Sequence, residues 1–101
     1  MTRLGRGEQE RIAKALADDR RFEILETIAG AGELSCKALV ERFPITQATV
    51  SHHLKELYVA GLVTFRQDGQ SRYYRARPEV LEQYLQQVER RLLRSRSRTA
   101  S

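Results

Sequence analysis

Two short helices separated by a four-residue break constrain this chain more than any other feature. They occupy residues 35–58, SCKALVERFPITQATVSHHLKELY, and the break is Phe43-Pro44-Ile45-Thr46. Ser35 and Thr46 stand where a side-chain oxygen can cap each helix, and Pro44 ends the first helix because it lacks a backbone donor. Each cap lies between two apolar residues spaced as a hydrophobic staple, namely Leu34 with Leu39 and Ile45 with Val50. Helices joined by so short a break cross steeply, which predicts a helix-turn-helix.

The second of these helices has one apolar and one polar side. At about 100° per residue, Val50, Leu54 and Leu57 fall within a narrow arc that we expect to be buried. The opposite arc carries small or polar side chains and one lysine: Ala48, Thr49, Ser51, His52, Lys55 and Glu56. Such a face suits the major groove of DNA, where base edges and phosphates offer donors and acceptors. A solvated helix face explains the pattern equally well, so this helix alone does not decide the function.

A β-hairpin is predicted directly after this helix. Gly61 is expected to end the helix, since glycine adopts the left-handed conformation most easily. Residues 62–67 and 70–75 have strand-like composition and flank Asp68-Gly69, a favoured two-residue turn. Pairing across this turn gives three expected pairs: Gln67 with Gln70, Phe65 with Arg72 and Val63 with Tyr74. One face can then pack on the helices, and the hairpin forms a wing that projects Arg66, Gln70 and Arg72.

Three further helices complete the expected fold. Residues 9–17 form a short amphipathic helix with a stripe of Ile12, Ala13, Ala15 and Leu16. Asp18 and Asp19 cap a second helix that runs to Gly30, with Phe22, Leu25 and Ile28 on its apolar stripe. Pro78 starts a last helix over residues 79–93. We expect the first and last helices to pair with their copies across a two-fold axis. The expected dimer interface is Ile12, Leu16, Leu81, Tyr84, Leu85, Val88 and Leu92.

Length and composition set the domain organisation. A chain of 101 residues holds one domain, near the size at which a partner subunit aids stability. We expect a flexible arm over residues 1–8, the winged helix-turn-helix domain over residues 9–93, and a disordered Arg/Ser-rich tail over residues 94–101. There is no apolar run of membrane-spanning length and no signal peptide, and the single cysteine fits a reducing compartment, so a cytoplasmic location is expected.

The net charge of +5 is unevenly distributed, and its distribution points to nucleic acid. Residues 90–101 carry five arginines and no acid, so residues 1–89 sum to zero. Within that neutral part, residues 46–77 hold five basic and two acidic side chains, whereas residues 78–89 hold three acidic and no basic ones. The positive excess therefore lies on the second helix of the motif, the hairpin and the tail.

The chain resembles the ArsR/SmtB family of small dimeric winged-helix repressors. Four segments carry the resemblance: LADDRRFEIL at 16–25, GELSCKAL at 32–39, ATVSHHLKEL at 48–57 and AGLVTFRQDGQSRYYRA at 60–76. The resemblance implies a mainly α fold of four helices, a two-stranded β wing and a fifth helix, with the first and fifth helices at the dimer interface. It also implies operator binding that blocks transcription until a signal releases the protein.

The sensor sites of the best-known relatives are missing. Metal-sensing members carry ELCVCDL on the third helix, where this chain has ELSCKAL, so Ser35 and Lys37 occupy the two cysteine positions. The last helix, residues 79–93, also lacks the Asp and His ligands of zinc-responsive members. His52 and His53 diverge by about 100° on one helix and have no third ligand, so neither a metal nor another cofactor is expected. Whether Cys36 is a redox switch or a small residue in a first helical turn stays open.

The resulting prediction is a homodimeric repressor that binds double-stranded DNA. No nucleophile–base set, phosphate loop or carboxylate pair supports an enzyme. His53 is expected to be structural because it lies on the flank of the buried stripe. The expected DNA contacts are Thr46, Gln47, Thr49, Ser51, His52, Lys55, Arg66, Gln70 and Arg72. Two alternatives remain, a winged helix that docks proteins and a thiol-responsive repressor that acts through Cys36, and the effector is unknown.

Overall fold

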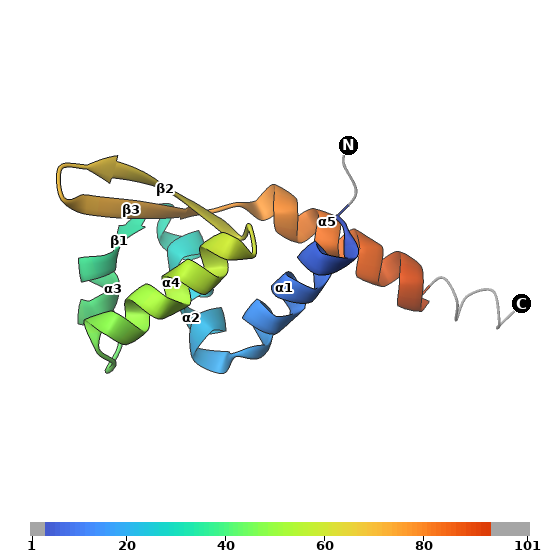
Figure 1. The fold of residues 1–101 in the computed structure, drawn as a ribbon, viewed down its shortest axis with the longest axis horizontal. Coiled ribbons are helices and arrows are strands. Elements are labelled where there is room, and N and C mark those ends of the chain that lie inside the picture. Colours follow the sequence, from blue (N-terminus) through green and yellow to red (C-terminus); the bar gives the residue numbers. More distant parts are fainter. Residues whose placement is uncertain (1–3, 94–101) are drawn as a thin grey trace, which may run out of the picture.

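The computed structural model describes residues 4–93 and has the predicted winged-helix architecture (Figure 1). The elements in order are α1 (Arg6–Ala17), α2 (Asp19–Ala31), β1 (Leu34–Ser35), α3 (Cys36–Arg42), α4 (Gln47–Val59), β2 (Val63–Asp68), β3 (Ser71–Ala76) and α5 (Pro78–Val88). A π-helical turn, Glu89–Leu93, continues α5. The expected tail and the first three residues of the expected arm lie outside the described residues. None of the described helices is both long and apolar enough to cross a membrane.

The local signals around the helix-turn-helix form as predicted. The Ser35 side chain accepts a hydrogen bond from the Ala38 amide at 3.1 Å, and Thr46 accepts one from the Thr49 amide at 3.2 Å. Helix α3 ends at Arg42, two residues before Pro44. Gly61 follows the end of α4 with a φ of 80°, the left-handed conformation that a side chain would oppose. Caps and stops therefore fix where both helices of the motif begin and end.

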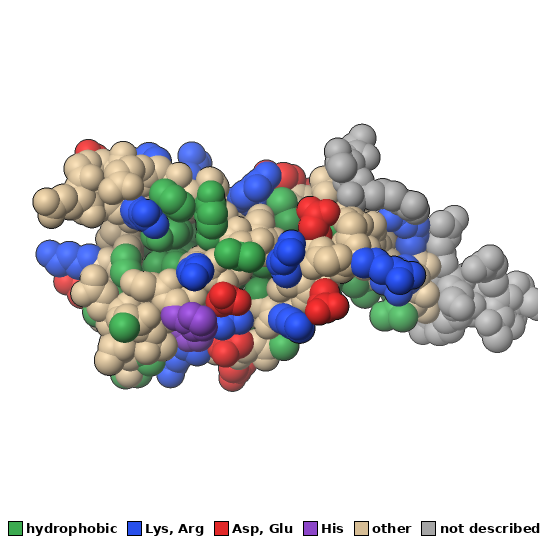
Figure 2. Space-filling view, in the orientation of Figure 1, with side chains coloured by type: hydrophobic (Ala, Val, Ile, Leu, Met, Phe, Trp, Pro, Cys, Tyr) green, Lys and Arg blue, Asp and Glu red, His purple; other side chains and the backbone are tan. Residues whose placement is uncertain are grey.

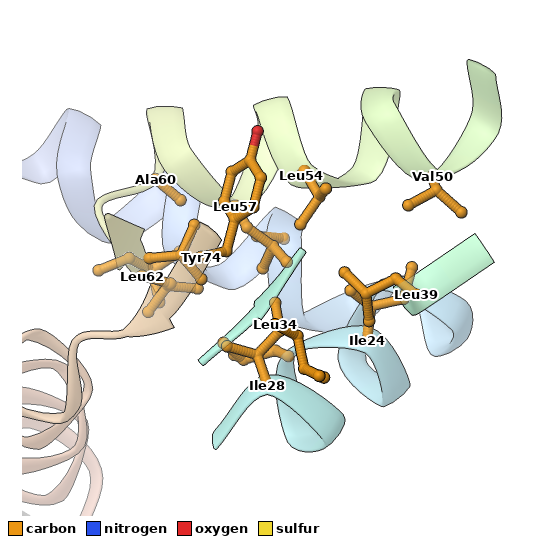
Figure 3. Close-up of a cluster of buried hydrophobic side chains, with 14 residues drawn as sticks. Ile24, Ile28, Leu34, Leu39, Val50, Leu54, Leu57, Ala60, Leu62 and Tyr74 are labelled. Atoms are coloured by element: carbon orange, nitrogen blue, oxygen red, sulfur yellow. The ribbon is translucent and has the colours of Figure 1, made fainter. Parts of the chain in front are cut away.

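One hydrophobic core packs the helix-turn-helix motif against the rest of the domain. The apolar stripe of α4 (Val50, Leu54 and Leu57) is fully buried against side chains from α2, β1 and α3, as Figure 3 shows. The buried members from those three elements are Ile24, Leu25, Ile28, Leu34 and Leu39. Because this side of α4 faces inward, its opposite side faces solvent.

The hairpin register differs from the predicted one. Asp68 pairs with Ser71, so the turn is Gly69-Gln70 and the expected pairing of Gln67 with Gln70 is wrong. Gly69 has a φ of 62°, and no described residue other than glycine has a positive φ. A turn with a positive φ at its first central residue only is the II′ type, which places glycine first. The slip is two residues, so each side chain keeps its predicted face although its partner changes.

The observed register also places two aromatic rings opposite each other. Phe65 pairs with Tyr74, where the prediction had Arg72, and the two ring centroids lie 5.5 Å apart. The strand β1 was missed altogether: Leu34 and Ser35 pair with Tyr74 and Tyr73, which makes the sheet three-stranded in the order β1-β3-β2. Two residues are too few to show an alternating pattern, so sequence alone could not reveal this strand.

Three details near the N-terminus also differ from expectation. Helix α1 begins at Arg6, so residues 6–8 are helical although they were assigned to the flexible arm. The Gly5 amide donates to the Glu8 carboxylate at 2.8 Å, a capping contact that a glycine at the cap position obscures in the sequence. Phe22 was placed on the buried stripe of α2 but is exposed, because Ile24, Leu25 and Ile28 already fill that side.

The Ser35 cap gives a direct test of this local architecture. Replacing Ser35 by Ala removes the acceptor of the Ala38 amide, and we expect a loss of about 1 kcal/mol in the free energy of unfolding. Ser35→Asp keeps an acceptor and should retain most of the stability. Urea unfolding followed by circular dichroism measures both. Equal stability of Ser35→Ala and the unaltered protein would contradict the role of the cap.

Candidate nucleic-acid interface

All nine residues predicted to contact DNA are exposed in the structure. Thr46, Gln47, Thr49, Ser51, His52 and Lys55 lie on α4 or at its cap, and Arg66, Gln70 and Arg72 lie on the hairpin. The hydroxyl groups of Thr46 and Thr49 also hydrogen-bond to each other at 2.9 Å, which orders the first turn of α4. Figure 2 shows histidine, with acidic and basic side chains next to it, on the face where α4 lies in Figure 1. The polar arc of the helix is therefore open to a large ligand.

Part of α4 and the hairpin line one shared groove of about 500 Å³. The lining residues come from α3, α4, β2, β3 and the hairpin turn: Cys36, Gln47, Ser51, Leu54, Lys55, Tyr58, Phe65, Gln70, Arg72 and Tyr74. Five of the predicted DNA contacts are among them. Thr49 and His52 lie on the other flank of α4, since they are rotated from Ser51 around the helix. The structure thus brings these five predicted contacts, from the helix and from the wing, together along one groove.

Two of the three arginines on the hairpin strands, Arg66 and Arg72, point to opposite faces of the hairpin. Arg72 lies on the α4 side, with its guanidinium 4.5 Å from the centroid of the Phe65 ring. Arg66 lies on the other side, where it donates two hydrogen bonds to Glu33 at 2.9 and 3.0 Å and stacks over Tyr73. This hydrogen bonding lowers the pKa of Glu33. Arg66 is therefore partly neutralised, a constraint that the sequence did not reveal.

His53 joins α4 to the start of α2. Its ring is only 7% exposed, and its Nδ1 accepts a hydrogen bond from Nε of Arg21 at 3.3 Å. Burial is the main reason that the pKa of His53 is lowered, aided by Arg21, His52 and Arg20 and opposed by Asp18. Because Nδ1 is an acceptor, His53 is held neutral here. The structure confirms that His53 faces inward and supports the core rather than the reading face.

Cys36 is the first residue of α3 and is partly buried. Its Sγ lies 3.7 Å from Oγ of Ser51 on α4. No group of three His, Cys, Asp or Glu side chains in residues 4–93 comes close enough together to hold a metal ion. The redox role considered for Cys36 stays a prediction that nothing in this geometry tests.

The predicted dimer surface separates into buried and exposed parts. Ile12 is 0% exposed within a single chain, so its side chain belongs to the protomer's own core and offers little surface to a second copy. Leu16, Leu81 and Tyr84 pack partly against that core. Leu85, at 54% exposure, and Leu92 are open to solvent. Sequence periodicity could not make this distinction, because it does not show which apolar side chains the protomer itself buries.

A polar contact between α1 and α5 was also missed. Gln87 is buried, and its Oε1 accepts a hydrogen bond from Nε2 of Gln9 at 3.1 Å. Arg91 donates to Oε1 of Gln9 at 2.9 Å. These bonds tie the first and last helices together within one chain.

Comparison with known proteins decides the family. The sequence profile of a family described as a helix-turn-helix domain matches residues 16–65. An arsenical resistance operon repressor from Staphylococcus aureus is 38% identical over 81 residues, which cover 80% of this chain and 77% of that protein. The chain belongs to the ArsR/SmtB family of transcriptional repressors.

Solved structures of ArsR-like regulators have the same fold as this ArsR/SmtB member. One from Rhodococcus sp. RHA1 is 29% identical with a TM-score of 0.83, covering 93% of this chain and 88% of that one. A homodimeric winged helix-turn-helix DNA-binding domain from Mycobacterium bovis is 34% identical with a TM-score of 0.69, covering 81% and 77%. The protein is thus a DNA-binding transcriptional repressor, as predicted. These relatives favour neither of the two alternatives left open by the sequence.

The buried His53 predicts a specific pH dependence of stability. Because its folded pKa lies below the ordinary 6.5, the unfolded chain takes up the proton first as the pH falls. Stability should therefore decline below that value until the folded histidine is also protonated. His53→Gln keeps an acceptor for Arg21 without titrating, so it should lose less stability between about pH 7 and pH 5.

Urea unfolding at several pH values measures this effect, with His52→Gln as the matched control. His52 is exposed, so its replacement should leave the decline of the unaltered protein in place. The pKa of Asp18 is also lowered, chiefly by the hydrogen bond from the Arg21 amide, but its stabilisation is lost only below its ordinary 3.8. Superimposable profiles for His53→Gln and the unaltered protein would exclude His53 as the source.

Proposed function

We propose that this ArsR/SmtB repressor binds an inverted-repeat operator as a homodimer, with α4 in the major groove and the wing beside it. The observation that carries the proposal is the exposed polar side of α4, which the buried stripe of the same helix holds outward. Its amide, hydroxyl and imidazole groups can exchange hydrogen bonds with base edges, and Lys55 can approach a phosphate. An α-helix fits the width of the major groove.

The wing supplies the second set of proposed contacts. Gln70 lies in the turn, and Arg72 lies on the side of β3 that faces α4. Both therefore line the same groove as the polar side chains of α4. We assign Arg72 to the DNA backbone or minor groove that flanks the reading helix. Arg66 is a weaker candidate, because it must first release Glu33 on the opposite face of the hairpin.

The homodimer is proposed from the exposed apolar residues of the last helix. Leu85, Leu92 and Leu93 are exposed in one protomer, and Val88 is partly exposed beside them. A second copy that covers these side chains would remove their apolar surface from water. In such a dimer the two α4 helices would read half-sites about one helical turn apart, roughly 34–36 Å.

His52 and Lys55 separate specific from general DNA binding. An operator is first selected from a random pool, and affinity is measured by fluorescence anisotropy at several salt concentrations. His52→Ala should weaken operator binding by about 5- to 150-fold and leave random DNA unchanged, because one base contact is worth about 1–3 kcal/mol. Lys55→Ala should weaken both DNAs about equally and lower the salt slope by about one per lost phosphate contact.

Lys14→Ala is the matched control for Lys55→Ala. Lys14 is exposed on α1, where it pairs with Glu10. Its replacement removes one positive charge, as Lys55→Ala does, but from a helix other than α4. Operator binding by the control should match that of the unaltered protein. If His52→Ala and Lys55→Ala also matched it, α4 would not be the reading helix.

Leu85 tests the dimer. Leu85→Glu places a charge on the exposed face of α5, so it should favour the monomer without unfolding it, and analytical ultracentrifugation should show this. Val59→Glu is the control, since Val59 is equally exposed on α4 but lies outside the proposed interface. In Leu85→Glu, operator affinity should fall because the dimer is lost. An intact Leu85→Glu dimer, or a monomeric parent protein, would contradict the proposed assembly.

A further inference from the structure

The groove between α4 and the wing has an aromatic wall that DNA reading does not require. Tyr58 of α4, Phe65 of β2 and Tyr74 of β3 form a continuous row, with ring centroids 5.2 Å apart for the first pair and 5.5 Å for the second. Tyr58 is 49% exposed and Phe65 is partly exposed, so their part of the wall is open to solvent, whereas Tyr74 is buried. Figure 2 shows hydrophobic side chains in this hollow, with basic side chains at its edges.

The groove is large enough to hold a small molecule. Its volume of about 500 Å³ lies within the usual range of about 300–1,000 Å³ for ligand pockets. Such pockets combine apolar and aromatic walls with a few convergent polar groups. Here Leu54 extends the apolar wall, and the hydroxyl of Ser51 and the amides of Gln47 and Gln70 line the rest.

The charge of the groove is entirely positive. Lys55 and Arg72 line it, and no Asp or Glu is among the lining residues that the structure describes. The Phe65 ring supports the Arg72 guanidinium, so this positive charge is directed along the aromatic wall rather than away from it. A ligand that matches both features needs a flat apolar ring and an anionic group.

We propose that this groove binds a small aromatic carboxylate, and that its occupation excludes DNA. The ring would pack against Tyr58 and Phe65, and the carboxylate would accept hydrogen bonds from Lys55 and Arg72. This regulation rests on the proposed function, because it assigns to the ligand two cations that the DNA phosphates would otherwise use. The carboxylate and a phosphate cannot occupy the same donors together, so binding of ligand and operator is mutually exclusive.

The size of the effect follows from mass action. A ligand that binds only the DNA-free protein weakens the apparent DNA affinity by a factor of 1 + L/Kd, where L is the ligand concentration and Kd is the dissociation constant of the ligand. At ten times that constant, the factor is about elevenfold for each groove that DNA would cover, and about a hundredfold for both grooves of a dimer.

The probe for direct binding is 2-naphthoate, titrated into the DNA-free protein and followed by amide chemical shifts. We expect saturable shifts around residues 54–58, 65 and 72–74, with a dissociation constant of about 0.1–1 mM for a ligand of this size. The neutral 2-naphthalenemethanol should bind about tenfold more weakly, because it cannot pair with the two cations. Cyclohexanecarboxylate, which is anionic but not aromatic, should also bind more weakly. Equal binding of the neutral compound, or no saturable shifts, would overturn the proposal.

Tyr58→Ala separates ligand binding from DNA binding. Tyr58 is not among the proposed DNA contacts, so this variant should bind the operator normally, yet bind 2-naphthoate about fivefold more weakly and resist its displacement of DNA. Val59→Ala, next along α4 and outside the groove, should behave like the unaltered protein. Unchanged naphthoate affinity in Tyr58→Ala, or naphthoate bound without displacing the operator, would overturn the proposal.

The measurements of operator binding and of naphthoate binding test the two proposals independently. Naphthoate shifts in a protein that binds no operator would refute the proposed DNA reading and leave the groove as a ligand site. Operator binding by α4 without naphthoate shifts would retain the DNA reading and refute the ligand site.

Discussion

The burial of one side of α4 is the constraint on which the rest of the structure depends. Val50, Leu54 and Leu57 are fully buried against α2, β1 and α3. Full burial of such side chains contributes about 1.5–3 kcal/mol each, so the helix cannot roll without a large loss of stability. The caps at Ser35 and Thr46 fix where α3 and α4 start, and the hydrogen bond between Arg21 and His53 ties α4 to α2. The polar side of α4 is thereby held outward and preorganised for a ligand.

The hairpin completes this surface because its aromatic face is turned toward α4. Phe65 contacts Tyr58 along the wall of the groove and supports Arg72, while Arg66 is held on the opposite face by Glu33. Two arginines of one wing thus have different environments: one is available to an anion and the other is already paired. The ion pair between Arg66 and Glu33 is exposed, so solvent screens it and it contributes little to stability. Its main consequence is that Arg66, unlike Arg72, is already paired and less free to bind an anion.

Sequence reasoning succeeded where the signal was local and failed where it depended on distant contacts. The caps, Pro44, Gly61 and the polar arc of α4 each act within a few residues, so their roles could be predicted. The hairpin register depends on which turn position Gly69 occupies and on the pairing of Phe65 with Tyr74, and the prediction slipped by two residues. The burial of Ile12 depends on distant contacts in the same way: its place in the periodic pattern is correct, but its neighbours are in the protomer's own core. The pairing of Glu33 with Arg66 joins residues far apart in sequence and left no local signal.

The most direct test of the central claim is affinity cleavage of a selected operator by iron-EDTA tethered to single cysteines in a Cys36→Ser background. With Ala48→Cys, at the exposed start of α4, we predict cleavage within the major groove of both half-sites. With Ala29→Cys, exposed on α2, the operator should remain intact. Cleavage from position 29 but not from position 48 would show that another surface faces DNA, and the outward side of α4 would then need a different role.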